Sequence, residues 1–435
     1  MVRKGYKQTE VGVIPEDWKL VRVGELEPFV TSGSRGWARY YSKFGAPFIR
    51  ITNLRRESIY LDLSDLRLVD LPEGVSEGKR TQLHNGDLLI SITADIGIIG
   101  YLDNSVSKPA YINQHISLVR FDSRKSDSKF IAYFLASESV QRLFRGATDQ
   151  GAKAGLNLDT IRSLKFAFPP TDEQRSIAQA LSDVDALIAA LDKAIAKQRA
   201  IKTATMQQLL TGRKRLPGFG EGKGYQQTEV GTIPEDWNVR ALGNLGRFKN
   251  GINKGSEDFG HGSPFVNLMD VFGISSISEV KHLGLVNSND AEKKVYDLKE
   301  GDVLFIRSSV KPSGVGLTTI ITRDLPSSVY SGFLIRFRDN GKLETDFKKY
   351  CFSEEKFRKR VIASSTISAN TNINQDNLKQ LCLAYPESSA EQRAIATVLS
   401  NMDAEIAALE TRLTKTQFIK QGMMQALLTG RTRLI

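Results

Sequence analysis

The chain has 435 residues, more than one ordinary domain, and its formal net charge of +11 favours an anionic partner without requiring one. Its two cysteines, Cys351 and Cys382, are too few for a disulfide framework or a zinc cluster. The first residues are polar, and the most apolar run, residues 88–101, is too short to span a membrane. We therefore expect a cytoplasmic protein with no membrane role, in which this run forms a buried pair of strands.

The sequence is a tandem duplication. Residues 5–18 (GYKQTEVGVIPEDW) return with two changes as residues 224–237 (GYQQTEVGTIPEDW). Two further motifs repeat at nearly the same offset, Glu-Gln-Arg at 173–175 and 391–393, and Leu-Leu-Thr-Gly-Arg at 209–213 and 427–431. Such a repeat defines the domain count better than length does. We predict boundaries at 1–169, 170–213, 214–386 and 387–435.

The region after each first motif is predicted to be an α/β domain. Short apolar and β-branched runs, broken by Gly, Asn, Asp and Ser, predict strands and turns. The first copy has such runs at 47–51, 86–92 and 116–121, followed by a helix over 129–144, and the second has them at 264–268, 301–307 and 333–337, followed by a helix over 347–362. The two regions have diverged most in their loops, where binding specificity usually resides.

A long helix is predicted after each α/β region. Residues 171–211 contain neither proline nor glycine, and their apolar positions recur in the second copy with a shift of 218. Apolar residues alternate at spacings of four and three, which is the a/d pattern of a coiled coil. Each helix is expected to end at a glycine, Gly212 or Gly430. The predicted seam consists of Ile177, Leu181, Val184, Ile188, Leu191, Ile195, Ile395, Leu399, Met402, Ile406, Leu409 and Leu413.

The two helices are predicted to be antiparallel. Only residues 214–224 separate the first helix from the second copy of the opening motif, so the second α/β region begins at the C-terminal end of that helix. A region of this size returns easily to the same end but does not cross the roughly 60 Å of a 40-residue helix. Each helix also begins acidic and ends basic, so antiparallel pairing places opposite charges side by side.

Motifs of catalysis are missing from the sequence. It contains no phosphate-binding Gly-x-x-x-x-Gly-Lys-[Ser/Thr] loop, no Asn/Asp-Pro-Pro-aromatic tetrad of an amino-methyltransferase and no His-Glu-x-x-His pair. The four histidines, at 84, 115, 261 and 282, are scattered, and we expect them to be structural or on the surface. No metal site and no cofactor are therefore expected, and the chain is predicted to be a binding protein.

Taken in order, the motifs resemble one known family. The Ile-Pro-x-x-Trp opening of each half, the Gly-Asp-[Leu/Val]-Leu strand, the Glu-Gln entry into a long helix and the Leu-Leu-Thr-Gly-Arg-x-Arg-Leu exit are similar to those of the specificity subunit of type I restriction-modification systems. The resemblance covers essentially the whole chain. It implies a mixed α+β protein with two homologous α/β target recognition domains, separated by two antiparallel helices in a coiled coil and related by a pseudo-two-fold axis.

The resemblance also implies a function and partners. Each domain would bind one half of a split sequence in double-stranded DNA, and the helices would set the gap between the halves and dock methyltransferase subunits, two in number, with restriction subunits possible. S-adenosylmethionine and ATP would belong to those partner subunits. Two alternatives stay open: a coiled-coil scaffold whose terminal domains bind proteins, and the recognition part of a single-chain restriction-methylation enzyme. Salt-dependent binding to duplex DNA would separate them.

Candidate DNA-contacting residues lie in the loops of the two α/β regions. Base readout uses side chains with two well-placed hydrogen-bonding groups, such as Arg, Asn and Gln, while Lys, Ser and Thr mostly contact phosphate. The candidates of the first region are Ser34, Arg35, Arg50, Asn53, Thr93, Asp95, Gln150 and Lys153, and those of the second are Asn253, Lys254, Asn267, Arg307, Ser309, Lys311, Asn370 and Asn372. Asp87 and Asp302 are expected to be turn or cap residues.

Overall fold

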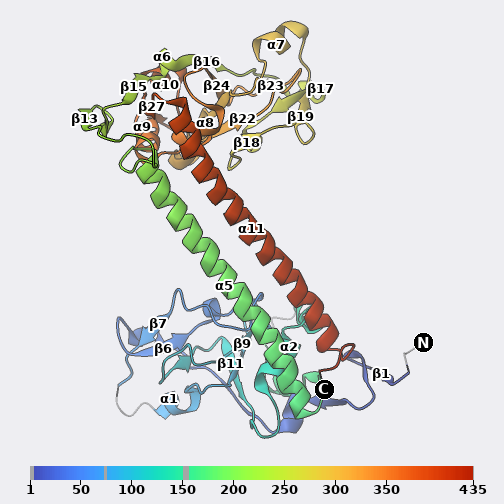
Figure 1. The fold of residues 1–435 in the computed structure, drawn as a ribbon. Helices are drawn as coiled ribbons and strands as arrows, with labels where there is room; N and C mark the ends of the chain where they lie inside the picture. The colour runs from blue at the N-terminus through green and yellow to red at the C-terminus, as the bar shows by residue number, and fades with distance from the viewer. Residues whose placement is uncertain (1–3, 73–75, 150–155, 435) are drawn as a thin grey trace. The chain divides into compact units, whose positions relative to one another are not determined.

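A computed structural model describes residues 4–72, 76–149 and 156–434 of the protein (Figure 1). Contacts group the chain into two compact units, unit 1 (residues 1–193 and 410–435) and unit 2 (residues 194–409). Two 39-residue helices, α5 (Thr171–Leu209) and α11 (Ser389–Leu427), each contribute one part to unit 1 and the other part to unit 2. No helix among the described residues is long and apolar enough to cross a membrane.

Among its described residues, unit 1 combines short strands with four α-helices of its own. The strands are β1 (Tyr6–Thr9), β2 (Gly12–Pro15), β3 (Lys19–Arg22), β4 (Phe29–Ser32), β5 (Tyr41–Ser42), β6 (Ala46–Ile49), β7 (Arg67–Val69), β8 (Leu88–Ser91), β9 (Ile99–Tyr101), β10 (Tyr111–Ile112), β11 (Ile116–Arg120) and β12 (Lys165–Phe168). The α-helices are α1 (Ser76–Thr81), α2 (Ser128–Leu135), α3 (Glu138–Asp149) and α4 (Leu158–Ser163), and the 3-10 helices are η1 (Val23–Leu26), η2 (Trp37–Tyr40) and η3 (Ile51–Asn53).

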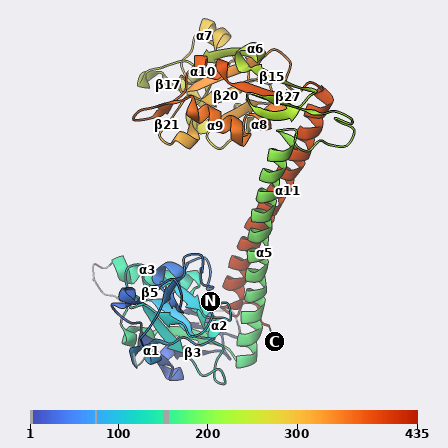
Figure 2. The ribbon, with the colours of Figure 1, turned by 90° about the vertical axis from the view of Figure 1, so that its left-hand side faces the viewer.

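The central sheet of unit 1 is buried on both faces. Its strand order is β4-β11-β8-β9, and all neighbours are antiparallel. Because side chains alternate along a strand, Leu88 and Ile90 of β8 face a core shared with α2 and the ends of the long helices, while Leu89 faces a second core. The second core is closed by residues that flank β6 and β10, which belong to a second sheet of order β10-β6-β7-β5. Figures 1 and 2 both show α2 beside the first part of α5.

Unit 2 repeats this arrangement with its own residues. Its strands are β13 (Tyr225–Thr228), β14 (Gly231–Pro234), β15 (Trp237–Ala241), β16 (Gly246–Asn250), β17 (Phe259–Val266), β18 (Ser276–Ile277), β19 (Gly284–Val286), β20 (Val303–Ile306), β21 (Ser308–Ser309), β22 (Thr318–Ile321), β23 (Val329–Tyr330), β24 (Leu334–Asp339), β25 (Thr366–Ile367), β26 (Thr371–Asn372) and β27 (Cys382–Pro386). Its helices are α6 (Leu242–Leu245), α7 (Asp290–Val295), α8 (Thr345–Cys351), α9 (Glu355–Ala363) and α10 (Gln375–Gln380), with the 3-10 helices η4 (Ser256–Asp258), η5 (Leu268–Asp270) and η6 (Pro312–Gly314).

The central sheet of unit 2 has the order β16-β24-β20-β22-β18 and is also buried on both faces. Val303 and Phe305 of β20 face the core that contains α8, α9 and the ends of the long helices, whereas Leu304 and Ile306 face the opposite core. Strands β20 and β24 of unit 2 occupy the places that β8 and β11 have in unit 1. Homologous sequence thus gives the same layers twice.

Two of the predicted helices are broken. The helix predicted over 129–144 is two helices, α2 and α3, and the one predicted over 347–362 is α8 and α9. In unit 2 the physical reason is a new N-terminus, because the Glu354 side chain accepts hydrogen bonds from the backbone amides of Lys356 and Phe357 and so caps α9. The predicted strand pair within 88–101 is confirmed by the pairing of β8 with β9.

In both units the long helices run in opposite directions. In unit 1, Lys420 of α11 pairs with Asp185 of α5, while Arg433, past the end of α11, pairs with Glu173 at the start of α5. In unit 2, Lys202 and Gln198 of α5 meet Asp403 and Glu405 of α11. In these pairs the residue numbers on α5 rise while those of their partners on and after α11 fall. This is the pattern of antiparallel helices. All twelve predicted seam residues are buried or half-buried.

Candidate functional site

Loops from four segments meet at one edge of the central sheet of unit 1, here called edge 1. They are the residues after β4, after β6 and after β8, together with the turn 113–115 before β11. The backbone amide of Ser34 donates to Ile112 O, that of Asn113 to Ile49 O, and that of Ile92 to His115 O, with N–O distances of 2.9–3.2 Å. Edge 1 therefore brings together segments of the chain that are up to about 80 residues apart.

Two candidate side chains of edge 1 are buried. The Ser34 hydroxyl lies 3.2 Å from that of Thr81, and the Asn53 side chain accepts from Arg50 N and donates to Asp62 O, which closes the turn of η3. The structure gives both side chains interior partners. The burial of Ser34 and Asn53 could not be predicted from their polarity or their position in a loop. Residues that cap a turn and residues that contact DNA belong to the same amino-acid types.

The other candidates of edge 1 are at least partly accessible. Arg35 and Asp95 are exposed, and the half-buried Arg50 and Thr93 lie beside them in the chain segments of edge 1. Asp95 forms an ion pair with Arg56, Arg50 pairs with Asp65 at 2.7 Å, and the Thr93 hydroxyl bonds the ring of His115. Gln150 and Lys153 lie outside the described residues. Contact of these candidate residues with DNA stays a prediction.

Unit 2 has an equivalent edge, here called edge 2. It consists of the residues after β16, β17 and β20, the turn 331–333 before β24, and the small sheet of β21, β26 and β25. Arg307 N donates to Phe333 O at 2.8 Å, Gly332 N to Ile252 O at 2.8 Å, and Ile373 N to Arg307 O at 2.9 Å. In unit 1 the bond from Leu156 N to Ile92 O has the same place as the last of these.

Edge 2 brings most of its candidates together. The half-buried guanidinium of Arg307 donates to Gly332 O at 3.4 Å, and the side chain of Asn253 lies against the backbone of the same glycine. Asn253, Lys311 and Asn370 are exposed, whereas Ser309 and Asn372 are half-buried in the small sheet. Two candidates have bonds within the unit: Lys254 pairs with Glu292 at 3.0 Å, and the exposed Asn267 caps η5 through its side chain.

Sequence reasoning missed the turn before the last central strand. Gln114 and His115 of edge 1 and Phe333 of edge 2 occupy this turn, next to the predicted residues. The histidine was expected to be structural or on the surface, and the structure shows it half-buried with its ring against Thr93. The available signal was the polar triplet Asn113-Gln114-His115 directly before a buried strand.

An ionic cluster explains why three motifs are duplicated. In unit 2, Arg215 of the exit motif donates to Asp236 of the opening motif at 2.8 and 2.9 Å and to Glu391 of the Glu-Gln-Arg motif at 2.6 and 2.7 Å. These bonds to Arg215 hold the pKa of Asp236 below its ordinary value. Unit 1 repeats the cluster with Arg433, Asp17 and Glu173. Each cluster also places the arginine over a tryptophan ring.

A second repeated cluster joins the two long helices. In unit 1 the ammonium of Lys420 lies 2.6 Å from Asp185, which also accepts from the hydroxyl of Tyr133 at 2.6 Å. Burial, together with the nearby charge of Asp185, raises the pKa of Tyr133 well above its ordinary range, so this hydroxyl stays a donor. Lys202, Asp403 and Tyr350 form the same cluster in unit 2. Both clusters lie at the interface of α5 and α11 and fix its register.

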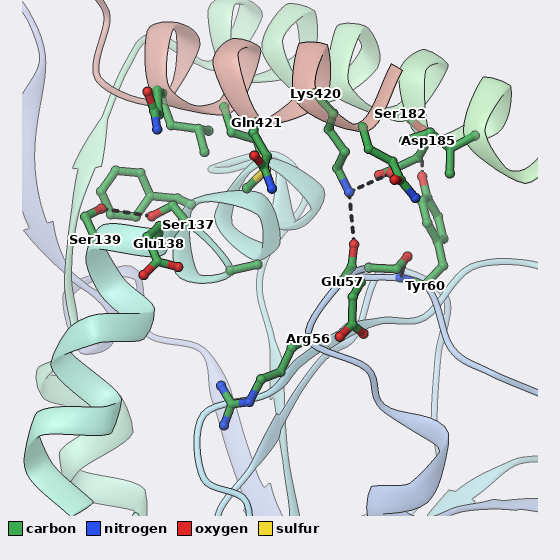
Figure 3. A pocket seen from close by; sticks show the side chains of 18 of the residues that line it. Arg56, Glu57, Tyr60, Ser137, Glu138, Ser139, Ser182, Asp185, Lys420 and Gln421 are labelled. Carbon is green, nitrogen blue, oxygen red and sulfur yellow. Dashed lines mark hydrogen bonds and ion pairs between the residues drawn. The ribbon is translucent and has the colours of Figure 1, made fainter. Parts of the chain in front are cut away.

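Unit 1 also contains a large open groove. It has a volume of about 1270 Å³ and is lined by α5, α11, the start of α3 and residues 56–60. Figure 3 shows Lys420 reaching from α11 to Asp185 and to the backbone oxygen of Glu57, with Arg56 next to Glu57 among the lining residues. Because Arg56 also pairs with Asp95, the groove adjoins edge 1. A groove of this size suits a segment of a protein partner better than a small ligand.

No group of His, Cys, Asp and Glu that could hold a metal ion occurs within 4–72, 76–149 and 156–434. The carboxylates of the ionic clusters are committed to arginine or lysine. Cys351 is buried, and burial raises the pKa of its thiol far above the ordinary value. Together the edges and the groove offer hydrogen bonding and apolar contact.

Comparison with known proteins identifies the family. The model of the type I restriction modification DNA specificity domain matches twice, at residues 15–198 and 234–417. The chain belongs to this family. Both matches begin within a copy of the opening motif and end within a long helix, so the family unit includes the α/β region and most of the helix that follows it. The role of this specificity subunit is the recognition of DNA.

Relatives cover the chain from end to end. A putative type I restriction enzyme MjaX specificity subunit of Methanocaldococcus jannaschii is 26% identical over 99% of this chain and 97% of its own. The MjaVIII specificity subunit of the same organism is 23% identical over 97% of this chain and 94% of its own.

Two solved structures share the fold. A chain from work on complex assembly and conformational transition of the type I R-M system matches with a TM-score of 0.55 and 16% identity over 96% of this chain and 99% of its own. The S subunit of a type I restriction-modification system from M. genitalium matches with a TM-score of 0.54 and 14% identity over 94% of this chain and 96% of its own.

Proposed function

We propose that each unit of this specificity subunit recognises one half of a bipartite DNA sequence through its own edge. The observation that supports this is the contrast between frame and edge. The ionic clusters, the four antiparallel strands of the central sheets and the Lys-Asp-Tyr contacts of the helices recur in both units, whereas the exposed residues of edges 1 and 2 differ. Two recognition sites on the same fold would have this pattern, because only their loops need to match different bases.

The chemistry of the edges suits the major groove. Arg307 and Asn253 of edge 2 converge on Gly332, and such side chains form the bidentate contacts that distinguish guanine and adenine. Lys311 and Arg35, both exposed, suit phosphate contacts that hold the protein on the duplex. In edge 1, Thr93, Gln114 and His115 bond one another and together form the polar group that would exchange these bonds for contacts with bases.

The long helices, as a coiled coil, set the gap between the two half-sites. Their seam residues are buried or half-buried, and the two Lys-Asp-Tyr clusters fix the register of one helix against the other. A register fixed at both ends suits a spacer, since a polar pair in an apolar seam disfavours sliding. A pseudo-two-fold relation of the units would let two edges contact one duplex about one helical turn apart.

Methyltransferase subunits, two per chain, dock on the helical side of the protein. The outer faces of the helices expose Phe418 and Ile419 of α11 and Leu187 of α5, and the groove of unit 1 opens between the same helices and α3. Exposed apolar residues beside a large groove are typical of a protein interface. We place S-adenosylmethionine, ATP and all catalysis in the partner subunits, with a restriction subunit as a further possible partner, so the chain itself is a non-catalytic subunit.

Titration with duplex DNA tests the proposal. The full chain, alone and with its methyltransferase partner, should bind duplexes that contain the host's methylated motif more tightly than a shuffled duplex, and the affinity should fall steeply with salt. The chain alone should bind no S-adenosylmethionine by calorimetry and transfer no methyl group, while the complex should do both. Salt-independent binding would favour the protein scaffold, and methyl transfer by the isolated chain would favour the single-chain enzyme.

The docking surface has its own test. Replacing Phe418 by glutamate should abolish co-purification of the methyltransferase subunit, because the substitution places a charge in an apolar interface. The matched control is Phe259→Glu in β17, an exposed phenylalanine of unit 2 that is away from the helices. Equal loss of the partner in both variants, or no loss in either, would exclude this surface.

A further inference from the structure

Edge 2 exposes large apolar side chains among its polar ones. Five side chains are more than half exposed: Val310 (80%), Met269 (76%), Ile367 (71%), Phe333 (58%) and Phe272 (51%). They come from four segments that are far apart in the sequence. A single exposed apolar residue is ordinary, but five at one edge indicate a surface that is covered by something.

The contacts of edge 2 bring these segments together. The ring of Phe272 and the hydroxyl of Ser309 lie on the same glycine, Gly314, so both are neighbours, and Val310 follows Ser309 directly. Ile367 lies in one row of the small sheet with Thr371 and Ser309, two strands away, or about 10 Å at the usual strand spacing.

Phe333 and Met269 extend the same surface. Phe333 O accepts the amide of Arg307, whose chain leads into Ser308 and Ser309. Met269 belongs to η5, one turn before Phe272. The apolar residues therefore come from the same segments as the groups that edge 2 offers for hydrogen bonding.

The described part of the corresponding surface of unit 1 is polar. The 3-10 helices η3 and η5 are equivalent, since Asn53 and Asp270 accept from the amides of Arg50 and Asn267 in the same way. This equivalence places Thr52 at the position of Met269 and Arg55 at that of Phe272. Counting from the paired central strands, His115 stands where unit 2 has Phe333. The loop that carries Val310, residues 307–316, is four residues longer than its counterpart in unit 1, residues 92–97, so Val310 has no direct counterpart there. The apolar surface is thus a property of one edge and not of the shared frame.

We infer that edge 2 recognises the C5 methyl groups of pyrimidines in the major groove, with Val310, Phe333 and Ile367 as the contacts. This inference rests on the proposed function. The C5 methyl of thymine is the one apolar group that the major groove presents, and apolar side chains recognise it by contact. A 5-methylcytosine presents the same methyl group. The exposed Lys311 and the guanidinium of Arg307 next to the apolar residues favour a polyanion over a protein as the covering partner.

The test uses deoxyuridine, which is thymidine without the C5 methyl group. After the methylated motif is mapped, each thymine of the target is replaced singly by uracil, and binding of the complex with its methyltransferase partner is measured at fixed salt. The half-site of unit 2 is the half that stays unchanged when residues 19–168 are exchanged for those of another family member. A second series places 5-methylcytosine or cytosine at each cytosine of that half and so distinguishes the two methyl sources.

We expect at least one replacement in this half to weaken binding about three- to tenfold. One carbon in an enclosed apolar pocket changes affinity by roughly tenfold or more, and an open surface should give less. In Phe333→Ser or Ile367→Ser the same replacement should have less than a twofold effect. The exposed Val295→Ser in α7, outside edge 2, should keep the full effect.

Three results would overturn the inference. The first is specific binding in which every replacement in the half-site of unit 2 changes affinity less than twofold. This result needs only the unsubstituted protein. The second is a half-site without thymine or 5-methylcytosine. The third is loss of the methyltransferase subunit in the serine variants with unchanged uracil sensitivity, which would make edge 2 a protein interface. Absence of any specific DNA binding would instead contradict the proposed function itself.

Discussion

At the scale of residues, the ionic clusters connect chain segments that are far apart in the sequence. Asp236 contributes to stability through Arg215, and that bond holds its pKa below the ordinary 3.8. A lowered carboxyl pKa adds stability that is present above 3.8 and is lost as the pH falls below it. Since the Asp236 side chain is about a third exposed, the contribution is about 1 kcal/mol or less.

We therefore expect Asp236→Asn to lower the urea midpoint at pH 7 and to have a shrinking effect as the pH falls below 3.8. The measurement is urea unfolding of both proteins from pH 7 to pH 3. Asp17→Asn in unit 1 is the matched control with a smaller effect, because Asp17 is more exposed. An effect of Asp236→Asn that stays constant down to pH 3 would mean that the charge pair contributes nothing.

The Lys-Asp-Tyr clusters allow a comparison between units. Lys420→Met leaves the buried Asp185 without its cation, and breaking a buried pair in this way costs roughly 3 kcal/mol or more. Lys202→Met in unit 2 should cost less, because Asp403 is a third exposed and retains water. Urea unfolding followed by tryptophan fluorescence measures both. The double variant Lys420→Met with Asp185→Leu should recover part of the loss; no recovery would exclude the unpaired charge as the cause.

Residue roles were the least predictable part of the site. Arg307, Asn253 and Lys311 could be selected from the sequence because loop position and residue type both favour DNA contact. Ser34 and Asn53 have the same features and are buried, since their partners Thr81 and Asp62 are fixed only by the tertiary fold. Phe333, which we propose as a methyl contact, was not selected because an apolar residue next to a strand is ordinarily part of the core.

At the scale of elements, the exit glycines have a double requirement. Gly430 has φ +67°, and a Cβ there would lie 2.4 Å from Pro15 of the opening motif. Gly430→Ala should therefore destabilise the protein by about 2 kcal/mol or more, through the left-handed backbone and the collision together.

Gly422→Ala is the matched control for the exit glycine. Gly422 lies inside α11 with nothing within 4 Å of a Cβ, so alanine there should stabilise the helix by roughly 0.5–1 kcal/mol. Thermal unfolding distinguishes the two substitutions by the sign of the change. Equal destabilisation by both would contradict the account of the helix C-terminus.

The elements themselves were largely predictable. The first long helix follows from periodicity and the absence of Pro and Gly, the second from the same periodicity, and the strand pair of 88–101 from its apolar run. The breaks between α2 and α3 and between α8 and α9 were not predictable from periodicity, because Glu354 becomes a cap only once its side chain turns back to the backbone of Lys356 and Phe357. The small sheet of edge 2 depends on the pairing of Ser308 with Asn372, 64 residues later, which no local pattern reveals.

At the scale of the whole molecule, the helices should act as a ruler. Inserting four residues into each helix where the units meet, after Lys193 and after Leu409, adds about 6 Å and about one turn. Both half-sites should stay the same while the unspecified gap grows by roughly two base pairs. Two-residue insertions at the same places rotate the units by about 200° and should abolish specific binding. A methylation map that shows an unchanged gap after the four-residue insertions would exclude the helices as the ruler.

The central claim is that this one chain specifies both halves of a bipartite DNA target. The most direct test is a genome-wide map of methylated bases in the host, with the chain present, deleted, and with residues 19–168 exchanged for those of another family member. We predict one motif of two specified halves and a fixed gap, lost on deletion and changed in one half only by the exchange. Methylation that survives the deletion, or an exchange that alters both halves, would contradict the claim.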